Sequence, residues 1–213
     1  MTAYLVDVEL LLIRHALPER RELVDGPADP ELSAAGRAQA EHLAAYLSSE
    51  RLHAIYSSPM RRAVETAAPL AEQQGVAVVL EDDVAEWDRH STEYVPVEEL
   101  KRTKDPRWQQ LLDGVWPGRE TTVAEFRAIV VGAIERVVRA HPSQKVAIVC
   151  HGGVINAYLG HVLSVADSTE FFYPNYTSIH RVAAARSGER SILTVNETAH
   201  LRGTGLPIGI NHE

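Results

Sequence analysis

The sequence has little of what several classes of protein require. It contains one cysteine, Cys150, among 213 residues, so an internal disulfide and a cysteine metal cage are both excluded. No apolar run reaches the length of a membrane-spanning helix. The apolar run near the start carries Asp7 and Glu9 and follows no basic segment. We therefore expect no secretory signal and a cytoplasmic location.

Basic charge is also scarce. The chain has 21 Lys and Arg residues against 29 Asp and Glu residues, which gives a formal net charge of −8. This balance argues against nucleic acid or an anionic membrane as a partner. Any positive site must be local, which favours a small anionic substrate. A hydrophobic content of 45% is typical of a globular protein.

Short apolar strands alternate with amphipathic helices along the chain. This order predicts an α/β fold, a three-layer α/β/α sandwich whose mostly parallel sheet has helices on both faces. The length predicts a single domain over residues 1–213. The expected strands cover residues 8–13, 52–57, 76–80, 146–150, 179–184 and 192–195, and the expected helices cover 32–47, 58–71, 122–138 and 154–163.

Capping signals mark three helix starts. Ser33 is a candidate N-cap, and Ser58-Pro59 has the pattern of an N-cap followed by a first helical residue. Thr122 to Glu125 forms a capping box. Pro69 lies inside the second helical pattern and is expected to kink or loosen that helix.

Two stretches do not follow this alternation. Residues 87–120 have weak periodicity and contain all three tryptophans, so we expect an inserted cap or a loop region there. The glycine-rich tail over 202–213 is expected to be flexible. Aromatic and basic residues of the insertion either line a substrate pocket or, as we favour for any single one, pack and solvate the insertion: Trp87, Tyr94, Trp108, Trp116, Lys101, Arg102, Lys104 and Arg107.

Two histidines follow expected buried strands. Arg14 and His15 follow the first strand, and His151 follows the strand over 146–150. Parallel strands deliver such residues to the carboxyl edge of the sheet, where α/β proteins bind ligands. Two imidazoles and a guanidinium there predict an anion site. Cys150, directly before His151, is either a nucleophilic thiol or, as we favour, a small packed residue.

Two helix starts would direct free N–H groups and positive dipole ends to the same edge. Arg62 lies on the first turn of one helix, and Gly152 and Gly153 let the backbone approach a ligand at the start of the other. Each motif alone has a structural explanation as well. An arginine in a charged helix is usually exposed, and His-Gly-Gly also suits a simple strand-to-helix turn.

Taken together, these motifs resemble the hallmarks of the histidine phosphatase superfamily, also called phosphoglycerate mutase-like. The resemblance rests on Arg14-His15-Ala16, Ser58 to Ala63 with Thr66-Ala67, and His151-Gly152-Gly153. Further similar segments are Asp29 to Gly36 with Gln39-Ala40, and residues 196–201. The motifs occur in the right order and span nearly the whole chain, so the resemblance implies the phosphoglycerate mutase-like fold.

The resemblance also implies a covalent mechanism in two steps. His15 would be the nucleophile and would form a phosphohistidine. Arg14, Arg62 and His151 would bind the phosphoryl oxygens and stabilise the transition state, with Gly152 as a backbone contact. No metal and no other cofactor is implied, because positive side chains take that role.

The resemblance also implies a carboxylic acid that donates a proton to the leaving group. Glu86 occupies the position that matches the family's proton donor. It would protonate the leaving oxygen and later accept a proton from the attacking water. Asp82, Asp83 and Asp88 are nearby alternatives.

The sequence departs from the mutases beside the site. Residues 16–19 read Ala-Leu-Pro-Glu where mutases carry a glycine and small polar residues, and residues 87–91 show no counterpart of the mutase tyrosine-glycine loop. A mutase needs specialised groups that keep water away from the phosphoenzyme. We therefore predict a phosphomonoester hydrolase that acts on a small phosphorylated substrate, with a mutase-type phosphotransferase as the alternative.

Two other functions stay open at this point. His15, His151 and Glu86 are a chemically reasonable ligand set for zinc, although the permanent charges of Arg14 and Arg62 would repel a divalent ion. A phosphate-binding protein without turnover is the weaker alternative. The sequence names no substrate, and it is compatible with a homo-oligomer.

Overall fold

A six-stranded sheet forms the centre of the protein. The computed structural model describes residues 7–113, 121–165 and 171–210. The strand order is β4-β3-β6-β1-β7-β8, in which β4, β3, β6 and β1 pair in parallel and β7 and β8 run antiparallel to their inner neighbours. The predicted mostly parallel sheet is confirmed. Its strands are β1 (Val8–Arg14), β3 (Ala54–Ser57), β4 (Val78–Leu80), β6 (Lys145–Cys150), β7 (Ile179–Ala184) and β8 (Arg190–Glu197).

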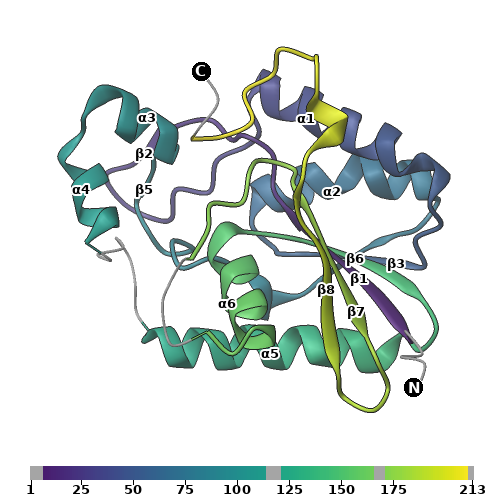
Figure 1. Cartoon of the computed structure of the whole chain (residues 1–213). Coiled ribbons are helices and arrows are strands. Elements are labelled where there is room, and N and C mark those ends of the chain that lie inside the picture. The colour runs from purple at the N-terminus through teal and green to yellow at the C-terminus, as the bar shows by residue number, and fades with distance from the viewer. Residues whose placement is uncertain (1–6, 114–120, 166–170, 211–213) are drawn as a thin grey trace.

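Helices cover both faces of this sheet, with α1 and α2 on one side and α5 and α6 on the other (Figure 1). Side chains alternate along each strand, so β1 buries Leu11 and Ile13 on the α1–α2 side and Leu10 and Leu12 on the α5–α6 side. The predicted layers are confirmed. The helices are α1 (Ala34–Tyr46), α2 (Arg61–Gln74), α5 (Val123–Ala140) and α6 (Gly152–Val162), with 3-10 turns at Leu47–Ser49, Asp82–Val84 and Ala199–Leu201.

The register of the parallel strands brings the sequence motifs together. Arg14, the last residue of β1, pairs with Cys150, the last residue of β6. His15 and His151 therefore leave adjacent strands at the same level. On the other side of β6, Ser57 pairs with Val149, so the turn into α2 starts at this edge too.

The helix starts agree with the sequence in two cases and differ in one. Ser33 caps α1, and Thr122 and Glu125 form the capping box of α5. The predicted start at Ser58-Pro59 is wrong, because α2 begins at Arg61 after a Met60 N-cap. Ser58 instead accepts a hydrogen bond from the Met60 N–H (3.2 Å), which leaves its hydroxyl beside the site. α2 continues past Pro69 to Gln74.

The prediction that the strand over 76–80 is buried is also wrong. β4 is short, and Val79 and Leu80 are 46% and 58% exposed. The reason is its place in the sheet: it is the edge strand, with β3 as its only pairing neighbour among the described strands. An apolar run alone does not distinguish an edge strand from a central one.

A small cap lies beside the carboxyl edge of the sheet (Figure 1). Its two-stranded ribbon joins β2 (Arg21–Glu22) to β5 (Glu93–Tyr94), and two short helices follow, α3 (Val97–Thr103) and α4 (Pro106–Leu112). Trp116 lies outside the described residues. The boundaries of the insertion stay a prediction.

The start of the tail contacts the body of the protein. The Tyr176 N–H donates to Ile208 O at 2.9 Å, and Gln39 Nε2 donates to Pro207 O. Tail flexibility stays a prediction. Each helix in the described ranges is too short or too polar to span a lipid bilayer.

Candidate active site

His15 is buried and held by two hydrogen bonds. Its backbone N–H donates to Cys150 O at 2.9 Å, which ties it to β6. Its ring Nδ1 lies 2.8 Å from Ala16 O. A carbonyl oxygen only accepts, so Nδ1 carries the proton and Nε2 keeps its lone pair. Burial and the nearby charges of Arg62 and Arg14 hold the pKa of His15 well below its usual value, so the ring is neutral.

Motif residues on α1 and α2 fix the turn after His15. The Ala16 N–H donates to Thr66 Oγ1 at 2.9 Å, and the Leu17 N–H donates to Gln39 Oε1 at 2.8 Å. Gly36 lets α1 approach this turn, because a Cβ there would lie 2.0 Å from Leu17 O. These residues position the nucleophile candidate without touching the cavity themselves.

His151 lies directly beside His15. The ring centres are 5.1 Å apart, and His151 is fully buried. Its Nε2 lies 2.8 Å from Ser58 Oγ. Burial, then the charge of Arg62, lowers its pKa well below the usual value, so this ring is neutral as well. The sequence did not single out Ser58 as a contact of His151, because it was assigned to the helix cap.

Two arginines complete a positive pocket. Arg14 donates from NH1 to Pro174 O at 2.6 Å, and its guanidinium lies 4.3 Å from the Tyr176 ring centre. Arg62, 1% exposed, donates to Asp88 Oδ1 at 2.7 Å and lies 4.7 Å from the Tyr94 ring centre. The exposed alternative for Arg62 is therefore wrong.

Several polar atoms of this group are buried without a protein partner. Among the described residues these include Arg14 Nε, Arg62 Nε and NH1, and His151 Nδ1. Buried polar groups normally find a hydrogen-bond partner. A cluster of unpaired guanidinium nitrogens on two fixed cations is suited to the oxygens of a bound anion.

Glu86 lies on the other side of the cavity, where its carboxylate contacts the first residues of α6. Its carboxylate accepts hydrogen bonds from the Trp87 N–H (3.0 Å) and the Gly153 N–H (2.7 Å). Burial, followed by the negative charge of Asp88, raises its pKa to about 7. A carboxyl group that titrates there can donate and accept protons near neutrality.

The alternative carboxylates lie elsewhere or have other partners. Asp82 is exposed, and Asp83 pairs with Arg136 on α5 at 2.8 Å. Asp88 lines the cavity but holds Arg62. The geometry therefore favours Glu86 among the four candidates.

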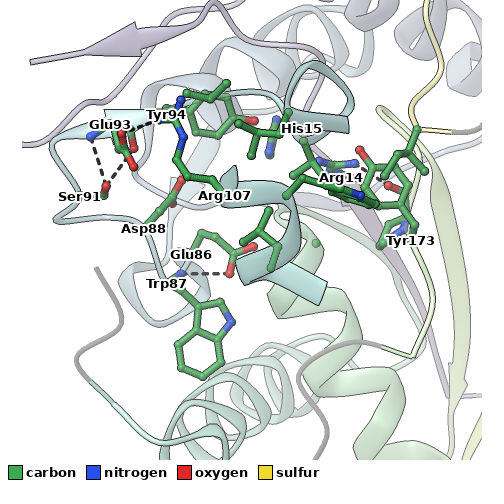
Figure 2. Close-up of a pocket in the computed structure, with 18 of the residues that line it drawn as sticks. Arg14, His15, Glu86, Trp87, Asp88, Ser91, Glu93, Tyr94, Arg107 and Tyr173 are labelled. Carbon is green, nitrogen blue, oxygen red and sulfur yellow. Dashed lines mark hydrogen bonds and ion pairs between the residues drawn. The ribbon is translucent and has the colours of Figure 1, made fainter. Parts of the chain in front are cut away.

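These groups surround one cavity of about 390 Å³, a size usual for small-molecule sites. Arg14, His15, Arg62, Glu86 and Gly152 line it, and the fully buried ring of His151 lies beside His15. Figure 2 shows His15, Arg14 and Glu86 around the same space. The structure thus brings together all the side chains that the sequence predicted.

The cap supplies part of the wall. Trp87, Tyr94, Arg107 and Trp108 line the cavity, so for them the pocket interpretation is the better one. The Trp87 ring turns toward α5 (Figure 2), where it stacks on Phe126 with ring centres 3.7 Å apart. The other basic residues of this run, Lys101, Arg102 and Lys104, are exposed and are not among the described lining residues.

A loop before β7 also reaches the site, although no sequence motif predicted its role. Tyr173 and Pro174 line the cavity and contact Arg14. Asn196 on β8 holds this loop, because its side chain accepts from the Asn175 N–H (2.8 Å) and donates to Tyr173 O (3.1 Å). The family resemblance at residues 196–201 was the sequence feature closest to this contact.

Two alternatives from the sequence lose support. Cys150 is fully buried in the core on the α5–α6 side, and burial raises the pKa of its thiol, so it packs rather than attacks. Within the described ranges, no three His, Cys, Asp or Glu residues are grouped so as to hold a metal ion, the set His15, His151 and Glu86 included.

Gly153 provides a first test of this geometry. A Cβ there would lie 2.3 Å from Glu86 Oε1 and 2.6 Å from Trp87 Nε1. We expect Gly153→Ala to displace Glu86 and to destabilise the protein by about 1–3 kcal/mol. Gly132→Ala on α5 is the matched control, because its Cβ meets only Arg136 NH1 at 3.8 Å. Urea unfolding of both variants measures the difference, and equal stabilities would contradict the close approach.

A parallel sheet edge that carries two neutral histidines and two buried arginines defines an α/β enzyme that handles phosphate groups. Comparison with known proteins agrees with this class. The model of the histidine phosphatase superfamily (branch 1) matches residues 10–198. The chain therefore belongs to the histidine phosphatase superfamily, and the predicted phosphatase class is confirmed.

Individual relatives give the same result. The chain is 33% identical over 200 residues to phosphoserine phosphatase 1 of Hydrogenobacter thermophilus, covering 91% of this chain and 94% of that protein. It is 33% identical over 150 residues to the uncharacterized phosphatase PhoE of Bacillus subtilis, with 70% and 74% covered. A phosphoserine phosphatase of Entamoeba histolytica, solved with 3-phosphoglyceric acid, shares the fold with a TM-score of 0.72 at 24% identity, covering 91% of this chain and 99% of that one.

Proposed function

We propose that this chain hydrolyses small phosphomonoesters through a phosphohistidine at His15, without a metal ion. The observation that carries the proposal is the hydrogen bond from His15 Nδ1 to Ala16 O at 2.8 Å. It fixes the tautomer in which Nε2 is a lone-pair donor, beside two buried cations that suit a phosphoryl group. The phosphatase names of the relatives support the same reaction class.

In the first step, His15 Nε2 attacks phosphorus. An N–P bond forms while the ester P–O bond breaks, and the leaving oxygen takes the proton of Glu86. Arg14, Arg62 and His151 bind the phosphoryl oxygens, with the Gly152 backbone as a further contact. Because these donors are fixed before the reaction, they stabilise developing charge at little reorganisation cost.

In the second step, water attacks the phosphohistidine. The Glu86 carboxylate takes the proton of this water, the N–P bond breaks and inorganic phosphate leaves. His15 and Glu86 return to their starting protonation states, so the cycle balances. A pKa of about 7 allows the same group to act as acid and then as base.

The residues around the site distinguish a hydrolase from the mutase alternative. Residues 87–95 bring Asp88, Ser91 and Glu93 to the cavity, and all three have other partners: Asp88 pairs with Arg62, Ser91 donates to Glu93 O at 2.9 Å, and Glu93 pairs with Arg107. The two carboxylates would also repel the second phosphate of a bisphosphate intermediate. This favours interception of the phosphohistidine by water.

This difference gives the test of hydrolase against mutase. Incubation with 3-phosphoglycerate is expected to release inorganic phosphate or to leave the compound unchanged, measured by phosphate assay and NMR. Formation of 2-phosphoglycerate far faster than phosphate release, especially with a bisphosphoglycerate primer, would establish the mutase instead. A cytoplasmic location stays a prediction, which cell fractionation would test.

A further inference from the structure

The cavity has two chemically different ends. The phosphate end holds Arg14, His15, Arg62 and Glu86. The far end lies under the cap and is walled by apolar side chains of its two helices: Val97 and Leu100 from α3, and Trp108, Leu111 and Leu112 from α4. Val95, Phe172 and Ile210 are further apolar lining residues of the cavity. A group esterified to the phosphate would extend from His15 into this apolar end.

The one cation in the far end is already neutralised. Arg107 donates from Nε and NH2 to Asp105 at 2.9 and 2.8 Å. Its NH1 donates to Glu93 at 2.7 Å and to Glu22 at 3.1 Å, and Figure 2 shows the contact with Glu93. Glu22 also pairs with Arg20 (2.9 Å), which pairs in turn with Glu99 (2.7 Å), so two guanidinium groups and four carboxylates leave this region with a negative balance. A carboxylate on the substrate would therefore meet repulsion rather than a partner.

Among the described lining residues, no other basic side chain lies in the far end to bind a substrate carboxylate. Beyond Arg14, His15, Arg62 and Glu86, their charged side chains are Arg107, Glu93 and Asp88, and Asp88 pairs with Arg62. Lys101, the nearest basic residue of α3 in sequence to Leu100, donates instead to Ile210 O at 3.3 Å. The apolar wall is consequently the main source of binding energy for the leaving group.

We propose that this site is selective for phosphomonoesters of uncharged, apolar alcohols and phenols, and that it discriminates against phosphorylated carboxylic acids such as 3-phosphoglycerate. The proposal rests on the proposed function for its chemistry, but its selectivity comes from the cap alone.

A homologous series of substrates tests the selectivity. Ethyl, butyl and hexyl phosphate have leaving groups of nearly equal reactivity, so differences in kcat/KM report binding of the chain. Each methylene that enters the apolar end is expected to raise kcat/KM about threefold to fourfold. Butyl phosphate is expected to be a better substrate than 3-phosphoglycerate, which has a similar length.

Two variants on α4 locate the effect. Leu111→Ser removes an apolar lining residue and is expected to reduce the rise of kcat/KM along the series. Gln110→Ser is the matched control, because Gln110 is exposed on the same helix and is not a lining residue of the described cavity. It is expected to keep the rise of the parent protein.

The outcomes are separable from those of the proposed function. A flat series, an unchanged rise in Leu111→Ser, or faster hydrolysis of 3-phosphoglycerate than of butyl phosphate would overturn the selectivity while phosphate release still supported the hydrolase. If no ester released phosphate, calorimetric titration with ethyl-, butyl- and hexylphosphonate would test the apolar end without turnover. Affinity that rises with chain length would support the proposal, and equal affinities would overturn it.

Discussion

Replacing His15 with alanine is expected to abolish phosphatase activity, with a loss of about 10³-fold or more in kcat on an aryl phosphate. The variant removes the only imidazole whose tautomer is fixed by Ala16 O, and with it the atom that would bond to phosphorus. The remaining arginines could still bind phosphate but could not form the covalent intermediate. Steady-state release of nitrophenol in metal-free buffer measures the loss.

The fold and the intermediate need separate controls. His161→Ala changes an exposed histidine on α6 and is expected to keep full activity, and circular dichroism compares the folds of both variants. Rapid quenching of the parent protein with labelled substrate should trap an acid-labile phosphoenzyme that His15→Ala lacks. Activity that disappears with a chelator and returns with zinc would contradict this mechanism and favour a metal site.

Replacing Glu86 with glutamine is expected to slow alkyl phosphates by about 10²- to 10⁴-fold and aryl phosphates far less. An alkoxide is a poor leaving group unless it is protonated, whereas a phenolate leaves readily without an acid. Glutamine has nearly the same shape but donates no proton to the leaving oxygen. The ratio of kcat/KM for hexyl phosphate and nitrophenyl phosphate in both proteins gives the measurement.

The pH profile provides a second measurement on the same residue. Burial and the neighbouring Asp88 raise the pKa of Glu86 to about 7, so the protonated acid is present below pH 7 and is lost above it. The rate on hexyl phosphate should fall as the pH rises through 7, and the residual rate of Glu86→Gln should lack this fall. Equal losses on both substrates, or a larger alkyl-selective loss in Asp83→Asn or Asp88→Asn, would show that another carboxylate is the acid.

The sequence predicted the sheet and the catalytic edge for a simple reason. Buried parallel strands are short apolar runs, and each run places its last residue at the same edge. The runs before His15 and His151 were therefore sufficient to bring the two rings together. The order of the motifs identified Arg62 and Glu86 as further site residues. Periodicity alone did not distinguish them from exposed charged residues.

Several features depended on contacts that local patterns do not encode. The N-cap of α2 is Met60 rather than Ser58, and Ser58 Oγ lies 2.8 Å from His151 Nε2. β4 is exposed because it is the edge strand of this sheet. The contact of Arg14 with Pro174 joins residues 160 positions apart, and no spacing rule relates them.

By itself, then, the sequence determined the α/β layers, the family and the groups expected to do the chemistry, because each rests on a local pattern or an ordered motif. Only the tertiary structure decided the protonation states and the shape of the pocket. The neutral rings of His15 and His151 and the raised pKa of Glu86 follow from burial among particular charges. The apolar far end follows from the way α3 and α4 fold over the sheet edge, since desolvation and shape arise only when distant segments pack together.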